Sequence, residues 1–131
     1  ESPALDVAHS LHDEKLGAQE LALLEDLAPY AGRTPRDVER LLLAYRLARP
    51  RTSACGALAL ALTWAMGASQ AETSALQSAI ESADDSANLI APAGQARFAE
   101  ALRLAEKAGP ISVGAWRAAQ AIAADYWLRA S

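Results

Sequence analysis

Apolar residues recur along this chain at intervals of three and four, the period of an amphipathic α-helix. This pattern predicts helices over residues 18–30, 34–49 and 92–108, one that begins at Ser69 and one that begins at Ser112. The predicted inward positions of the helices over 18–30 and 92–108 are Leu21, Leu24, Leu27, Ala28, Phe98, Ala101, Leu102 and Ala105, with Glu20 and Arg97 among the outward ones. Residues 84–94 are predicted to form a loop, with Leu89 and Ile90 against the body of the domain.

Two of the predicted helices begin with explicit capping signals. Thr34 precedes Pro35, whose fixed φ suits the first helical position, and Asp37 follows three residues after the cap. Ser69 and Glu72 form a Ser-x-x-Glu capping box for the helix that is predicted to begin at Ser69. Both starts are therefore specified locally.

The helix over residues 34–49 has two distinct faces. Its core side is predicted to be the stripe of Val38, Leu41, Leu42, Tyr45 and Ala48. The opposite side, called here the outer face, consists of Arg36, Arg40, Leu43 and Leu47. Two arginines followed by two leucines indicate a surface that meets a partner; the alternative is an ordinary solvated face with two exposed leucines.

Residues 52–71 carry no charge, which raises the question of a membrane span. A spanning helix needs about 20 apolar residues, whereas the apolar part here, 54–68, is shorter and is interrupted by Gly56, Thr63 and Gly67. We therefore predict a buried central helix. The single cysteine, Cys55, lies in this run and is predicted to be a small buried residue, which is compatible with a reducing, cytoplasmic compartment.

Composition indicates an all-α fold. Alanine makes up about a quarter of the 131 residues, and aromatic and β-branched residues are scarce. We predict a compact bundle of about six helices with Trp64, Phe98 and Trp116 in or near its core; a short superhelix is the alternative arrangement. Residues 17–131 are expected to form a single helical domain and residues 1–16 a poorly ordered segment. Because the chain begins at Glu1 and its only methionine is Met66, it is expected to be a fragment of a larger protein.

The sequence lacks the usual signs of catalysis and metal binding. It has no Walker A loop, no Gly-x-Ser-x-Gly and no His-Glu-x-x-His motif, so no catalytic residue is predicted. The two histidines, His9 and His12, do not match zinc-ligand spacing, so no metal site is predicted. The adjacent Asp84 and Asp85 are typical of a turn. A net charge of −4 argues against nucleic-acid binding.

One stretch, GRTPRDVERLLLAYRL, resembles a known family. Its Gly32, Pro35, Arg36, Arg40, Leu41, Tyr45 and Leu47 match the segment that follows the nucleotide-binding core of KAP-type P-loop NTPases, although Glu39 and Leu43 depart from that pattern. A looser similarity lies near the end of the chain, in AWRAAQAIAADYW. The resemblance implies a parent protein that binds ATP and Mg²⁺ in a separate core and is often membrane-associated.

Two functions follow from these observations. In the first, the chain is a non-catalytic regulatory domain C-terminal to a P-loop NTPase core, which is its partner, and Arg36 senses phosphate. In the second, it is a free-standing helical interaction module whose outer face, with Arg36, Arg40, Leu43 and Leu47, binds another protein. Neither function requires a cofactor in this chain.

Overall fold

The computed structural model describes residues 17–32 and 34–130, with side chains as far as Tyr126. The segment expected to be poorly ordered, residues 1–16, and its two histidines lie outside these described residues. The described part is all-α. It has six α-helices: α2 (Ala18–Ala31), α3 (Pro35–Ala48), α4 (Cys55–Gly67), α5 (Gln70–Ile80), α6 (Ala96–Ala105) and α7 (Val113–Ala130). Two short 3₁₀ helices follow α3 and α6, namely Arg49–Arg51 (η2) and Glu106–Ala108 (η3).

Helix α4 is the central helix of the bundle, as the uncharged run predicted. It packs against α2, α3, α6 and α7, and every residue from Gly56 to Trp64 is buried. The buried hydroxyl of Thr63 donates a hydrogen bond of 2.7 Å to the carbonyl of Ala59, so this hydroxyl is paired within its own helix. Among the described residues no helix is both long and apolar enough to cross a bilayer.

Three aromatic rings from three helices form the middle of the core. The ring of Phe98 on α6 lies edge-to-face with Trp64 on α4, 4.9 Å between centroids, and with Trp116 on α7, 5.5 Å away. All three side chains are almost completely buried. The prediction that these residues lie in the core is confirmed.

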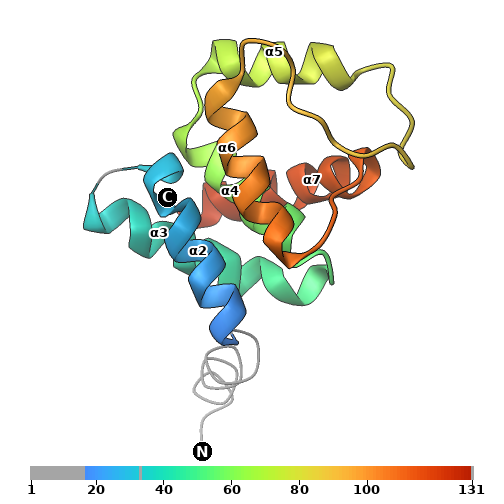
Figure 1. Cartoon of the computed structure of the whole chain (residues 1–131). Helices are drawn as coiled ribbons and strands as arrows, with labels where there is room; N and C mark the ends of the chain where they lie inside the picture. Colours follow the sequence, from blue (N-terminus) through green and yellow to red (C-terminus); the bar gives the residue numbers. More distant parts are fainter. Residues whose placement is uncertain (1–16, 33, 131) are drawn as a thin grey trace, which may run out of the picture.

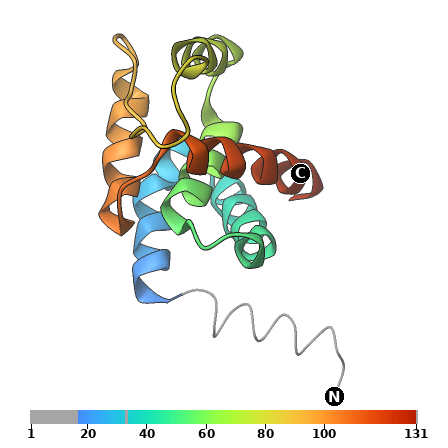
Figure 2. The ribbon, with the colours of Figure 1, turned by 90° about the vertical axis from the view of Figure 1, so that its right-hand side faces the viewer.

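Helix α5 lies at one end of the molecule, at the top of both views (Figure 1, Figure 2). Its start is fixed by the predicted capping box, in which the Glu72 amide donates to Ser69 at 3.1 Å and the Ser69 amide donates to Glu72 at 2.9 Å. Only Leu76 and Ile80 of this helix are buried. Helix α5 therefore contributes only two side chains to the core.

The connection from α5 to α6 is longer than the sequence indicated. Helix α6 begins at Ala96 and not at residue 92, because the chain first makes a turn in which Gly94 has a φ of +83°. Leu89 is buried as predicted, and its amide donates to the carbonyl of Ile111 at 2.8 Å. The prediction for Ile90 is wrong, since its side chain is 74% exposed.

The inward face of α2 is rotated from the predicted one. Leu23 is buried, whereas Leu21, predicted to face inward, is 37% exposed. The physical reason is that α2 packs against α3, α4 and α6, so its buried arc is centred on Leu24 and Leu27 and extends toward Leu23. Leu21 lies at the edge of this arc.

Candidate functional site: the outer face of α3

The first turn of α3 is fixed by its own sequence. The Asp37 amide donates to the Thr34 hydroxyl at 3.1 Å, and the Thr34 amide donates to the Asp37 carboxylate at 3.2 Å. Pro35 occupies the first helical position, where no backbone donor is needed. This cap fixes where α3 begins, whereas the packing of its buried side against α2, α4 and α7 sets which side faces outward.

The outer face of α3 points away from the bundle, which confirms three of its four predicted positions. Arg36 is exposed, and the side chains of Leu43 and Leu47 are 47% and 38% exposed. Arg40 is only half-buried and not fully outward, because it lies one turn from the buried Ala44 on the flank of the helix. The opposite side of α3 packs against α2, α4 and α7.

The remaining residues of the family-like motif have structural roles. Tyr45 is completely buried, and its hydroxyl donates to the carboxylate of Glu20 at 2.8 Å. At Gly32 a Cβ atom would collide with the side chain of Asp37, so glycine allows α2 to end directly against the cap of α3. Arg36 is exposed and makes no hydrogen bond or ion pair with any described residue, so contacts within the fold do not explain it.

A half-buried polar cluster fastens α3 to α2, and the sequence pattern missed it. Glu20, predicted to be solvated, accepts hydrogen bonds from Tyr45 and from Arg49, the latter at 2.5 Å. Burial by itself raises the pKa of this carboxyl, but the hydrogen bonds from Arg49, Tyr45 and Cys55 outweigh it and leave the pKa below its ordinary value. Glu20 is therefore ionised at neutral pH, and its carboxylate is engaged by hydrogen bonds within the fold.

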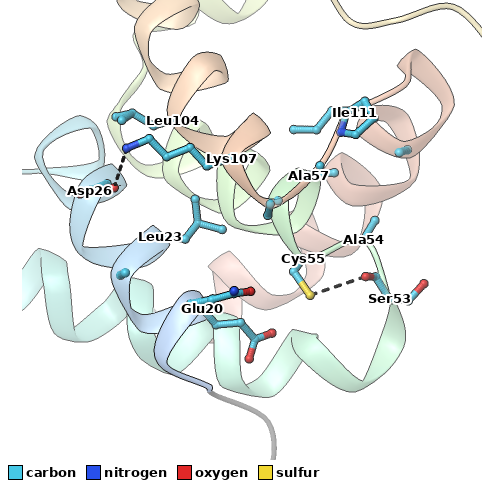
Figure 3. A pocket seen from close by; sticks show the side chains of 17 residues that line it. Glu20, Leu23, Asp26, Ser53, Ala54, Cys55, Ala57, Leu104, Lys107 and Ile111 are labelled. Carbon is cyan, nitrogen blue, oxygen red and sulfur yellow. Dashed lines mark hydrogen bonds and ion pairs between the residues drawn. The ribbon is translucent and has the colours of Figure 1, made fainter.

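A cavity of about 420 Å³ opens between α2, the start of α4, η3 and the start of α7 (Figure 3). Its wall is mostly apolar, with Leu23, Ala57 and Ile111 among the lining side chains, and the ion pair between Lys107 and Asp26 lies at its edge with 3.6 Å between the charged atoms.

Cys55 lines this cavity and is half-buried, so it is less enclosed than predicted. Burial and the neighbouring Glu20 carboxylate raise the pKa of its thiol, which stays protonated and weakly nucleophilic at neutral pH. Among the residues that the structure describes, no group of three or more potential ligands is placed to hold a metal ion.

Arg97 is a second residue whose role the sequence concealed. It was predicted to be solvated, but its guanidinium donates to the carbonyl of Tyr30 at 2.9 Å and to the carbonyl of Gly67 at 3.2 Å. These carbonyls end α2 and α4, where helix dipoles favour a positive charge. One side chain of α6 thus caps two other helices.

The fold and this surface define a small all-α domain with an outward Arg/Leu helix face. No protein-family profile, curated protein or solved structure matches this chain.

Proposed function

We propose that this chain is a non-catalytic helical domain that docks, through the outer face of α3, on the nucleotide-binding core of a P-loop NTPase resembling the KAP type. Docking relays or restrains the nucleotide state of that core. The observation that carries the proposal is the outward position of Arg36, Leu43 and Leu47 in one line on a helix whose other sides are packed.

The position of Arg36 supports a role outside the domain. It lies in the first turn of α3, where the helix dipole favours acidic side chains and disfavours a guanidinium. Residues that violate a local preference without a compensating contact in the fold are expected at functional sites. A guanidinium at this position can pair with a phosphate oxygen or a carboxylate of the docked core.

The experiment uses the full-length protein that contains this chain. Leu43→Ser with Leu47→Ser is expected to lower its ATPase rate or its assembly, while the unfolding free energy of the domain falls by only ~1 kcal/mol per site, because each leucine is about half covered within the domain. The matched control is Leu21→Ser on α2, because Leu21 is 37% exposed and Leu47 is 38% exposed. An unchanged rate and assembly in the double variant would contradict the proposal.

The same face also supports the alternative of a free-standing interaction module. The two functions differ in what is covalently attached to the chain. A Gly-x-x-x-x-Gly-Lys-(Ser/Thr) loop encoded upstream of Glu1 supports the NTPase-linked function, because that loop holds the phosphates of ATP. Its absence favours the module, whose partner is then a separate protein.

A further inference from the structure

We propose that the partner element on the outer face of α3 is an amphipathic helix with apolar residues opposite Leu43 and Leu47 and acidic residues opposite Arg36. This inference rests on the proposed function, since both use the same face, and it adds the chemical class and secondary structure of the partner.

The spacing of the outer face favours a helix as the partner. Its residues 36, 40, 43 and 47 follow one another at intervals of four, three and four. This is the repeat by which one helix packs along another, with side chains of each helix inserted between those of the other. Leu43 and Leu47, 47% and 38% exposed, lie one turn apart and form the apolar part of this line.

The charge on this side of α3 favours an acidic partner. Among the described residues of α3, Arg36 is exposed and Arg40 and Arg46 are half-buried, against one exposed carboxylate, that of Glu39. Within the fold Arg49 pairs with Glu20 and Arg51 with Asp125. Arg36 remains exposed at the positive end of α3, so an opposing carboxylate meets both the guanidinium and the helix dipole.

A membrane surface fits this face less well. Interfacial helices bury a broad apolar face that carries large residues along its whole length. Here two leucines form a narrow line, with the exposed carboxylate of Glu39 on one flank and the half-buried Arg40 on the other. A narrow apolar line with charged flanks is typical of contact between two helices.

The experiment titrates the whole 131-residue chain with two synthetic helical peptides. Both peptides are about three heptads long and carry leucines at intervals of three and four. One has glutamates at the positions that will oppose Arg36, and the other has lysines there. Fluorescence anisotropy at low salt is expected to show at least ~10-fold tighter binding of the glutamate peptide.

Variants make the result specific to this face. Arg36→Glu is expected to reverse the preference toward the lysine peptide, and Leu43→Ser with Leu47→Ser to abolish binding of both. Arg103→Glu on α6, an exposed arginine elsewhere, and Leu21→Ser on α2 are the matched controls and are expected to leave binding unchanged.

Several results would overturn the inference. These are equal binding of the two peptides, binding of neither, or co-sedimentation of the chain with phosphatidylserine vesicles that is lost in the double leucine variant. Self-association of the chain that is lost in that variant would show that the partner is a second copy, and it would also overturn the inference.

If the leucine variant impairs the full-length protein but Arg36→Glu leaves peptide preference unchanged, the proposed function stands and this inference fails. If peptide preference reverses as expected but the full-length protein is unaffected by the leucine variant, the inference stands and the proposed function fails.

Discussion

The carbonyl oxygen of Tyr30 lies against the Cα atom of Gly67, so close that a Cβ atom on Gly67 would overlap it. The last turns of α2 and α4 meet at this point. The guanidinium of Arg97 donates hydrogen bonds to the backbone carbonyls of Tyr30 and of Gly67. Its guanidinium also lies over the rings of Trp64 and Tyr30, 5.5 and 5.9 Å from their centroids. The contact holds three helices together at one end of the bundle.

Gly67→Ala is expected to destabilise the domain, although alanine is a better helix former than glycine. The added methyl group must displace the backbone of α2, and overpacking of this kind costs ~1–3 kcal/mol, which exceeds the ~1 kcal/mol gained from helix propensity. Urea unfolding followed by circular dichroism measures the difference. Gly17→Ala is the comparison without overpacking, because no atom lies within 4 Å of the new methyl group and its cost is limited to the N-cap preference of glycine over alanine. An unchanged unfolding midpoint for Gly67→Ala would show that the two helix ends are not tightly packed.

Arg97→Ala is expected to lower the unfolding free energy by ~2–3 kcal/mol, since hydrogen bonds from a charged group contribute ~1.5–3 kcal/mol. Arg97→Lys should recover only part of this loss, because an ammonium lacks the fork that reaches two carbonyls. Arg103→Ala is the comparison on the same helix. Arg103 is exposed, so its replacement should change stability by no more than ~0.5 kcal/mol. Equal effects of the two alanine variants would contradict the role of Arg97.

The Glu20 cluster predicts a pH dependence of stability. The pKa of Glu20 in the folded state lies below its ordinary value of 4.5, so the unfolded chain binds a proton first as the pH falls. The stabilisation from Glu20 is therefore complete above the ordinary pKa and is lost as the pH falls through the lowered one. Glu20→Gln should cost ~2 kcal/mol at pH 7 and progressively less below about pH 4.5.

Thermal unfolding of the Glu20→Gln variant between pH 7 and pH 3 tests this dependence, with the exposed Glu25→Gln as control. A difference between wild type and Glu20→Gln that stays constant over this range would be inconsistent with an ionised Glu20 in the fold.

Tyr45 predicts a second pH dependence, at alkaline pH, because burial and the hydrogen bond to Glu20 raise the pKa of its phenol. Stability should therefore also fall above about pH 10, where the unfolded tyrosine ionises.

The chain by itself is expected to bind ATP no tighter than about 1 mM, which corresponds to ~4 kcal/mol. The exposed Arg36 offers one guanidinium, whereas nucleotide sites also use a backbone cradle and a lysine around the phosphates. Isothermal titration calorimetry with Mg-ATP measures this directly. Micromolar binding would show that the domain contains a nucleotide site of its own and would remove the need for a separate core.

The sequence alone determined that the chain forms an all-α bundle, and it identified the aromatic centre of its core, Trp64, Phe98 and Trp116. Alanine content and helical periodicity predicted the all-α bundle, and the capping residues Thr34 and Ser69 fixed two helix starts, because these signals act within a few residues of the chain. The same local periodicity placed Arg36, Leu43 and Leu47 on the outer side of α3.

Only the tertiary structure decided the roles of the charged residues that the pattern placed on solvent-exposed helix faces. Glu20 and Arg97 look like solvated positions in their own helices, but each lies where a second or third helix brings an unpaired hydrogen-bonding group within reach. The exposed Leu21 shows the same limit, since the buried arc of α2 depends on the three helices packed against it, α3, α4 and α6, and not on its own period. Contacts between segments distant in sequence depend on how the helices pack, and the period of one helix carries no information about that packing.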